Sequence, residues 1–396
     1  MRAMRITAGS APPLKRRALL AVFLTICVSL VGFGIVIPLL PAYGKRFTAS
    51  ELQIGLLFAS FSVAQLLASP LLGEWSDRWG RRPVLILSLL GSALSFVILA
   101  WAPGLGWLFV SRLVDGFTGG NITTARAYIA DISEPSERAR NFGLIGAAFG
   151  LGFILGPALG GALAHFGLAV PAWFAVGLSL ASAGLAWAWL PETVHHHSTR
   201  SGSPGWRELP RFVRQSPLGW LLLINFMMWT GFSVYQTTFP LFADIRFHMT
   251  PTQVGYVLAF VGLVGVVMQG AVVGRVVRRL GERPTFMLGL VLNVWGLVGA
   301  SLTHSIGLFY GLAGLASAGG ALALPAFTSI LSQSAQEDEQ GRLQGVSGSI
   351  ESLARIVGPI WGNGLLRYDT ALPYASAGLL LLTAGILTAR LHMAAE

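Results

Sequence analysis

Twelve apolar stretches follow one another along this chain of 396 residues, and each is long enough to cross a lipid bilayer. The hydrocarbon core of a bilayer is about 30 Å thick and needs about 20 residues of helix. Charges, prolines or glycines bound every stretch, as they do at the ends of membrane-spanning helices. We therefore predict an all-α integral membrane protein with twelve transmembrane helices, at residues 18–41, 51–72, 84–102, 104–130, 141–164, 171–190, 217–242, 252–273, 285–303, 306–331, 343–364 and 371–389.

The composition excludes most water-soluble proteins. Charged side chains make up 11% of the residues and hydrophobic ones 54%, whereas about 25% charged residues is usual in soluble domains. So few charges cannot cover a surface that faces water. A soluble enzyme, a soluble nucleic-acid-binding protein and a disordered chain are therefore poor interpretations.

The basic residues gather on one side of the predicted membrane. If the N-terminus is cytoplasmic, 20 of the 27 lysines and arginines fall on the cytoplasmic side and only four on the opposite side. Short basic loops resist translocation, so this asymmetry places both termini in the cytoplasm and the chain in the cell inner (plasma) membrane. The net charge of +10 then reflects topology and contact with anionic lipid rather than nucleic-acid binding.

The two halves of the chain repeat each other. Arg140 matches Arg342, and Gly156-Pro157 matches Gly358-Pro359, in both cases 202 residues later. Because six helices separate equivalent points, the halves have the same orientation, as in two-bundle transporters whose substrate site lies between the bundles. We predict an N-terminal six-helix bundle at 1–190, a basic cytoplasmic linker at 191–216 and a C-terminal six-helix bundle at 217–396.

A loop rich in glycine and arginine joins the second and third predicted helices. Six of its residues are candidates for a cytoplasmic latch: Gly73, Asp77, Arg78, Gly80, Arg81 and Arg82. The glycines allow close helix approach and a tight turn, and the Asp77 carboxylate suits the positive N-terminal end of a neighbouring helix. Arg81 and Arg82 could pair with acids such as Asp131. A basic turn that only sets the topology is the alternative interpretation.

The fifth predicted helix carries glycines at every fourth position, at Gly152, Gly156 and Gly160. They share one face of the helix and predict close packing against another helix. Pro157 removes a helical hydrogen bond in the same stretch, and Gly161 follows. A packing face without any further role would also explain these glycines.

The fourth predicted helix contains charges at membrane depth. Arg112 and Asp115 are three residues apart and share a helix face. A charge at this depth is costly and indicates a functional site by default, with a purely structural ion pair as the alternative. Asn121 and Arg126 follow on the same stretch and are candidates for the substrate cavity.

These motifs together resemble the major facilitator superfamily over nearly the whole chain. The loop at 73–83 resembles the family's cytoplasmic signature, which latches the two halves in the outward-open state. The segment 156–161 is similar to the antiporter signature of the drug-efflux branch, and Arg112 occupies the position that this branch associates with proton coupling. The segment 112–161 looks most like the tetracycline-resistance efflux group. The resemblance implies the major facilitator fold, alternating access, drug:proton antiport and a role in antibiotic resistance.

Two acids of the tetracycline group are absent. Ser29 takes the place of an aspartate in the first helix, and an acid of the third helix corresponds to about Ser95. We therefore do not expect tetracycline itself to be the substrate.

The second half has one acid–base pair within a span, Glu351 and Arg355, four residues apart on the eleventh predicted helix. Glu351 is a second candidate for proton coupling and Arg355 for the cavity, although a structural pair is the alternative. Asn225, Tyr235 and Gln236 on the seventh predicted helix are further cavity candidates, because the resemblance implies that this helix lines the cavity.

The sequence shows no phosphate-binding loop, catalytic triad or metal site. The histidines His195–His197 are adjacent and are not expected to converge on one ion. We predict no enzyme, no cofactor and no metal, so that an ion gradient must drive transport.

Three functions stay open. The leading one is a monomeric proton-coupled antiporter that exports small amphipathic drug-like molecules, with protons and membrane lipid as its other partners and no nucleic acid. The second is a proton-coupled transporter of an anionic metabolite, for which Arg126 is the candidate anion anchor. The third is a membrane sensor that transports nothing.

Overall fold

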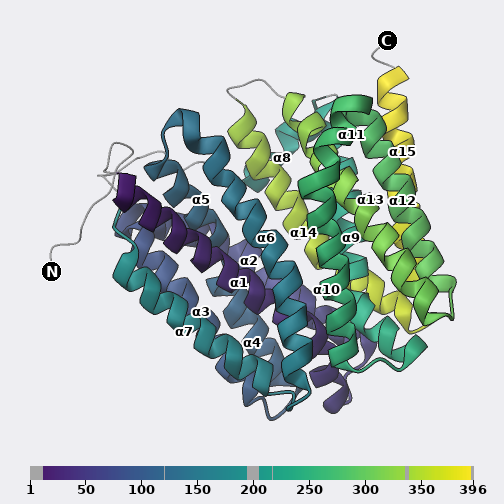
Figure 1. The fold of residues 1–396 in the computed structure, drawn as a ribbon, viewed down its shortest axis with the longest axis horizontal. Helices are drawn as coiled ribbons and strands as arrows, with labels where there is room; N and C mark the ends of the chain where they lie inside the picture. Colours follow the sequence, from purple (N-terminus) through teal and green to yellow (C-terminus); the bar gives the residue numbers. More distant parts are fainter. Residues whose placement is uncertain (1–11, 120, 194–204, 216, 335–338, 394–396) are drawn as a thin grey trace. The chain divides into compact units, whose positions relative to one another are not determined.

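The computed structural model describes residues 12–119, 121–193, 205–215, 217–334 and 339–393, and these residues are almost entirely helical (Figure 1). In chain order the helices are α1 (Pro12–Arg46), α2 (Glu51–Trp79), α3 (Arg81–Ala100), α4 (Leu105–Thr118), α5 (Asn121–Ile132), α6 (Pro135–Ala164), α7 (Val170–Trp189), α8 (Gly205–Val213), α9 (Leu218–Phe247), α10 (Pro251–Val267), the π-helical turn η1 (Met268–Val272), α11 (Val273–Leu280), α12 (Glu282–Leu302), α13 (Ile306–Gln333), α14 (Gln340–Leu366) and α15 (Leu372–Met393).

The helices account for every predicted span. Within the described residues, ten continuous helices are long and apolar enough to cross a membrane on their own. The two remaining predicted spans correspond to α4 with α5, and to α14. Helices satisfy their own backbone hydrogen bonds, which lipid cannot do for them. The all-α membrane fold predicted from the sequence is confirmed, and the described part of the chain contains no β-strand.

The fourth predicted span, residues 104–130, is not one continuous helix. It divides into α4 and α5 at Gly119, the residue that caps α4. Glycine is a poor helix former, by about 1 kcal/mol relative to alanine, and two glycines are adjacent here. The Gln65 side-chain amide of α2 donates to the freed Gly119 carbonyl over 3.0 Å, which stabilises the break.

The predicted linker at 191–216 contains a helix that the sequence analysis did not predict. This helix, α8, buries the Phe212 side chain completely. Its Arg211 Nη2 donates to Glu339 Oε1 over 2.6 Å. The buried aromatic ring and the ion pair stabilise this short helix. His195–His197 lie outside the described residues.

The backbone contacts divide the chain into two compact units. The first consists of Met1–Ala49, Ser60–Gly202 and Pro251–Tyr256, and the second of Ser50–Ala59, Ser203–Thr250 and Val257–Glu396. The bundle boundaries expected from the sequence stay a prediction. Each unit is described by itself.

In the first unit, α1 and α6 lie side by side (Figure 1) and approach closely through glycines. A Cβ atom on Gly156 would lie 2.6 Å from the Cα of Gly34 and 2.8 Å from the carbonyl oxygen of Val31. Gly152 and Gly160 meet the α1 backbone in the same way. The glycine face of α6 is therefore directed at α1, where side chains would force the helices apart.

The end of α6 lies against the first turn of α10, which belongs to the same unit. Thr252 Oγ1 donates to the Gly161 carbonyl over 2.7 Å. A Cβ atom on Gly161 would lie 2.9 Å from the Cα of Gly255, and one on Gly255 would meet the Pro157 carbonyl. Two glycines and a proline carbonyl thus form a close contact that tolerates no side chain.

The second unit has an aromatic core between α9, α13 and α15. Phe239, Phe242, Phe309 and Tyr374 are each at most 2% exposed. The ring centroids of Phe242 and Tyr374 are 4.8 Å apart, and those of Phe239 and Phe309 are 5.9 Å apart. Such ring pairs stabilise a core beyond the burial of their area.

Leucine at position 156 should push α1 and α6 apart, because the new side chain would enter backbone that already lies within 3 Å of a Cβ position. We expect Gly156→Leu to lower the free energy of unfolding by about 1–3 kcal/mol or more. Gly146→Leu on the same helix is the matched control, since no atom lies within 4 Å of its Cβ position. Thermal unfolding in detergent micelles compares the two, and equal midpoints would mean that the glycine face does not carry the contact.

Candidate functional site

Within the first unit, α4 carries a buried ion pair. Arg112 Nη1 donates to Asp115 Oδ2 over 3.1 Å, and the two side chains are 2% and 7% exposed. A spacing of three residues places them on one helix face, as the sequence indicates. The structure therefore brings together the two charges that the sequence analysis selected in the fourth span.

Serine hydroxyl groups surround this pair. Ser111 Oγ accepts from Arg112 Nη2 over 3.2 Å and donates to the Ser95 carbonyl of α3 over 2.9 Å. The hydroxyl groups of Ser92 and Ser95 lie beside the Asp115 carboxylate. Thus α3 supplies a polar lining at the level where α4 places its charges, and Ser95 stands at the position where the resemblance led us to look for an acid.

The burial of the pair restricts its chemistry. Removing one partner of a buried ion pair leaves an uncompensated charge and costs about 3–5 kcal/mol. The Asp115 carboxyl therefore has two forms of different cost: ionised and paired with Arg112, or protonated, in which case the buried guanidinium loses its counter-charge. A group with two such forms can take up a proton and release it again.

A second polar cluster lies between α9 and α14 of the second unit. Asn225 Nδ2 donates to Ser347 Oγ over 3.0 Å, and Ser347 Oγ lies 3.4 Å from Glu351 Oε1. Glu351 and Arg355 interact electrostatically. The Arg355 guanidinium is 6.0 Å from the centroid of the Trp229 ring. Asn225 therefore ties two helices together, while Glu351 and Arg355 keep the acid–base character that the sequence indicates.

The other candidates on α9 lie in packed surroundings. The Tyr235 ring centroid is 5.8 Å from that of Phe239 and 6.3 Å from that of Tyr374. The Tyr235 hydroxyl is buried and has no hydrogen-bond partner in the described part of the chain. Gln236 is 8% exposed. Both residues stay cavity candidates, although both are buried and the Tyr235 ring packs against other aromatic rings of its own unit.

The two candidates on α5 differ from the buried pair on α4. Asn121 is the first residue of α5. Arg126 is exposed, and it forms no ion pair with any described residue. A free guanidinium on a predicted membrane span can receive an anion.

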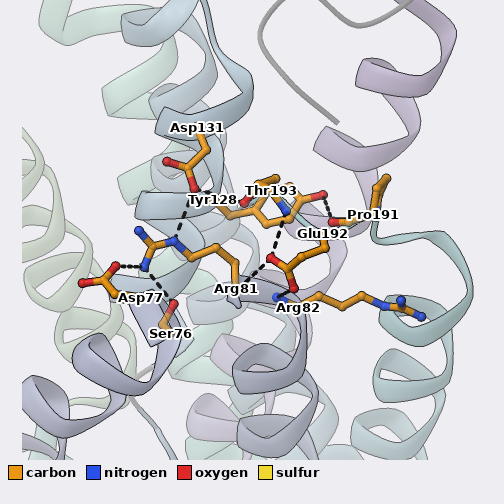
Figure 2. Close-up of polar contacts among 9 residues, drawn as sticks. All are labelled: Ser76, Asp77, Arg81, Arg82, Tyr128, Asp131, Pro191, Glu192 and Thr193. Carbon is orange, nitrogen blue, oxygen red and sulfur yellow. Dashed lines mark hydrogen bonds and ion pairs between the residues drawn. The ribbon is translucent and has the colours of Figure 1, made fainter. Parts of the chain in front are cut away.

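Arg81 is the centre of the loop cluster shown in Figure 2, around the turn that joins α2 and α3. Its guanidinium pairs with Asp77 one turn earlier and with Asp131 of α5, at 3.3 Å from Nε to Oδ2. Arg81 Nη1 also donates to Ser76 Oγ over 2.9 Å. The predicted pairing of Arg81 with Asp131 is present, and Asp77 neutralises the same arginine.

Arg82 does not share this arrangement. Its side chain points away from Arg81 in Figure 2, and its guanidinium donates to the Trp187 carbonyl of α7. Successive residues of a helix are about 100° apart, since 3.6 residues make one turn. The sequence analysis offered Asp131 to both arginines, but the helix can direct only one of them there.

The remaining loop candidates make weak contacts. Arg78 Nη1 is 3.8 Å from Glu74 Oε1, and both side chains are more than half exposed. Exposed pairs of this kind contribute about 0–1 kcal/mol. No atom lies within 4 Å of a Cβ position on Gly73. The close helix approach expected at Gly73 is therefore not seen in the described residues.

Glu192 caps the start of α3, a role that the sequence analysis missed. Its carboxylate accepts from the backbone N–H groups of Arg81 and Arg82 over 2.9 Å and 3.3 Å. The first N–H groups of a helix lack intrahelical partners, and a negative charge is favourable there. Gly80 has a φ of +107°, and a Cβ atom on it would lie 2.6 Å from Glu192 Cδ. Gly80 thus allows both the turn and the approach of the carboxylate.

Two further contacts hold Glu192 in place (Figure 2). Tyr128 Oη donates to the Pro191 carbonyl over 2.9 Å, and Thr193 Oγ1 donates to Asp131 Oδ2 over 3.0 Å. Glu192 and Arg81 are 111 residues apart in the sequence. No local pattern links them. The sequence offered one indication of this cap: Glu192 is an acid directly after the sixth predicted span, on the same side of the membrane as the loop.

The chain is similar to known proteins over most of its length. The family model of the Major Facilitator Superfamily matches residues 22–359 and 221–394. The chain is 33% identical to the class C tetracycline resistance protein of Escherichia coli over 355 residues, which cover 87% of this chain and 88% of the relative. It is 31% identical to Multidrug resistance protein 2 of Bacillus subtilis (strain 168) over 366 residues, 90% of each chain.

Solved structures show the same fold. The human organic anion transporter MFSD10 is similar at a TM-score of 0.71 and 26% identity, over 96% of this chain and 100% of that chain. A bacterial homologue of the human lysosomal transporter Spinster is similar at a TM-score of 0.75 and 16% identity, over 98% of both chains.

Replacing Glu192 by alanine should destabilise the loop cluster, because two backbone N–H groups of α3 lose a charged acceptor. We expect a loss of about 1–2 kcal/mol in the free energy of unfolding. Glu74→Ala removes an exposed partner of Arg78 and should change it by less than about 0.5 kcal/mol. Chemical unfolding in mixed micelles measures both variants. A Glu192→Ala protein as stable as Glu74→Ala would contradict the capping role.

Proposed function

The chain belongs to the Major Facilitator Superfamily, a family of multi-pass membrane transporters of small molecules, and we propose that it is a proton-coupled antiporter. It exports small amphipathic drug-like molecules from the cytoplasm and admits protons in exchange. The observation that carries this proposal is the buried Arg112–Asp115 pair on α4.

The proton coupling follows from the two forms of the Asp115 carboxyl. A proton that arrives from outside neutralises the carboxylate and weakens its attraction to Arg112, which is 3.1 Å away. The guanidinium keeps Ser111 Oγ as an acceptor but loses its counter-charge. This change in pairing favours the inward-facing state, in which the drug displaces the proton. A charge that appears and disappears at this depth is large enough to shift a conformational equilibrium.

The relatives support drug export. The two bacterial relatives are a tetracycline resistance protein and a multidrug resistance protein, and both match this chain over nearly its full length. Drug-like molecules share size and amphipathic character rather than one functional group. A broad class of amphipathic substrates therefore fits the relatives better than a single metabolite.

The setting in the cell is also part of the proposal. Both termini face the cytoplasm of the inner membrane, the protein works as a monomer, and lipid surrounds it. The loop cluster around Arg81, Asp77 and Asp131 acts as a cytoplasmic latch during alternating access. Glu351 is the second candidate for proton coupling.

Asp115→Asn should abolish proton-driven export and leave the protein folded, because an amide resembles the protonated acid in shape but cannot change its charge. We expect a loss of about 10²-fold or more in the initial rate of efflux driven by an imposed pH gradient. The assay uses proteoliposomes with ethidium and a panel of fluorescent dyes as probes. Glu74→Gln, which alters an exposed acid, is the matched control.

Exchange of labelled for unlabelled dye at equal pH should continue in Asp115→Asn, since this exchange needs no net proton movement. Full pH-driven efflux by the variant would remove Asp115 from the coupling role and direct attention to Glu351. A wild-type protein that moves no dye under any gradient would contradict the proposed function as a whole.

One observation favours a second candidate function, the transport of organic anions. The exposed Arg126 has no ion pair among the described residues, and the similar human structure is named an organic anion transporter. In this alternative, Arg126 binds the anionic group of the substrate.

Carboxyfluorescein separates the two candidates in the same proteoliposomes. If the protein transports organic anions, this anionic dye should be moved, and Arg126→Gln should reduce its uptake about tenfold or more, since the loss of a charge pair worth about 1.4 kcal/mol is a tenfold change in binding. Arg214→Gln, at another exposed arginine, is the control. Transport of cationic ethidium with unchanged rate in Arg126→Gln would instead support drug export.

A further inference from the structure

Two buried hydroxyl groups between α3 and α5 have no hydrogen-bond partner within the described part of the chain. They are Oγ of Ser88 on α3 and Oγ1 of Thr124 on α5. Each residue is 1% exposed. A threonine in a helix can donate to the carbonyl four residues earlier, as Thr118 does to Val114, but Ser88 and Thr124 do not. A buried polar group without a partner is unfavourable and needs an explanation.

Two contacts define how α3 is aligned with α4 and α5. Arg81 at the start of α3 meets Asp131 near the end of α5, so the two helices run in opposite directions. One end of the contact is thus the loop cluster. Further along α3, a Cβ atom on Gly91 would lie 2.7 Å from Thr118 Oγ1, at the end of α4.

Ser88 and Thr124 lie at the same level between these two contacts. Ser88 comes seven residues after the first residue of α3, and Thr124 comes seven residues before Asp131. Leu85, one turn from Ser88, belongs to the same hydrophobic cluster as Ala125, next to Thr124. Ser88 and Thr124 are therefore both neighbours of the same buried cluster.

Ser88 and Thr124 are the middle of a row of polar groups. Along α3 the row extends toward the buried ion pair. Ser92 is one turn beyond Ser88 on the same face of α3, and its hydroxyl lies beside the Asp115 carboxylate. Ser88 is thus one helical turn from a neighbour of the proposed proton-binding group.

Polar groups also continue the row toward the loop. Tyr128 is one turn beyond Thr124 on α5, and Asp131 is about one further turn away, so the three share a helix face. The Tyr128 hydroxyl donates to the Pro191 carbonyl and keeps a lone pair for another donor. Asp131 stands at the loop cluster and is partly exposed (Figure 2).

Charged groups stand only at the two ends of this row, as far as the described residues of α1, α3, α4, α5 and α7 show. One end has Arg112 and Asp115. The other has Asp77, Arg81, Asp131 and Glu192, together with Arg82, whose charge acts on Tyr128. Arg126 of α5 is exposed rather than buried in the row. Within these described helices, no other charge in between could trap a proton.

The break of the fourth span supplies further polar groups beside Thr124. The last carbonyls of α4 and the first N–H groups of α5 lack intrahelical partners. A buried water molecule needs about two to four polar partners. Ser88 Oγ and Thr124 Oγ1 supply two such partners.

We propose that water bridges Ser88 and Thr124 and completes a hydrogen-bonded proton route from Asp115 to Asp131 inside the first unit. This inference rests on the proposed function, because it assigns a path to the proton that Asp115 releases. The Asp115 carboxylic acid gives its proton to the neighbouring water, and each water passes a different proton along its hydrogen bond. Asp131 or the cytoplasmic solvent receives one proton, and no other bond changes.

The first experiment removes both hydroxyl groups without changing the volume much, in the double variant Ser88→Ala/Thr124→Val. Proteoliposomes report ethidium efflux driven by a pH gradient, and exchange of labelled ethidium at equal pH. We expect the driven efflux to fall about tenfold, since apolar groups cannot replace the hydrogen bonds of a bridging water, and the exchange to stay near wild type. Ser182→Ala, which removes another buried unpartnered hydroxyl on α7, is the matched control and should leave both rates unchanged.

The outcomes separate this inference from the proposed function. Driven efflux in the wild type with no change in the double variant would overturn the water route and leave the antiporter intact. Equal losses of driven efflux and exchange would also overturn it, because a general packing defect would then explain both. Absence of driven efflux in the wild type would overturn the proposed function.

The second experiment tests hydration without transport. In a Cys27→Ser background, the single variants Ser88→Cys and Thr124→Cys are exposed to methanethiosulfonate ethylammonium, which reacts with thiolates that water can reach. Ala183→Cys is the control, since Ala183 is 5% exposed and lies in an apolar cluster with Leu89 and Ala186. We expect reaction at positions 88 and 124 and none at 183. Absence of reaction at all three positions would show that the region is dry and the route wrong.

Discussion

The buried ion pair of Asp115 and Arg112 constrains the sequence and the packing of the helices around it. Both charges are buried away from water, so the groups that contact them must provide polar interactions in place of the lost hydration. The serines of α3 and the hydroxyl of Ser111 provide these polar interactions. Helix α3 therefore departs from a purely apolar sequence at the level of the pair, and its position against α4 follows from that need.

Where one helix determines its own pattern, the sequence was sufficient. The glycines at every fourth position of α6 indicate a close contact before its partner, α1, is known. The spacing of Arg112 and Asp115 likewise predicts their pairing, because residues three apart share a face. The spans themselves follow from length and hydropathy, so the fold class needed no tertiary information.

Features that depend on two distant segments were not predictable in the same way. Glu192 caps α3 across 111 residues, and nothing in its own surroundings marks it as a cap. Gln65 stabilises the break at Gly119 from another helix, so an apolar stretch that looks continuous in the sequence divides in two. Asn225 of α9 forms a hydrogen bond with Ser347 of α14, a partner that its own helix does not indicate. In each case the deciding partner lies elsewhere in the chain.

The contacts around Glu192 have a consequence for how the chain could be divided. The Tyr128–Pro191 bond, the cap on α3 and the Thr193–Asp131 bond all fasten the exit of α7 before the chain leaves the described part of the first unit. The geometry of α7 is thus secured by its own neighbours and not by tension from later residues. A backbone cut directly after Thr193 would therefore leave the end of α7 attached to α3 and α5 through these three contacts.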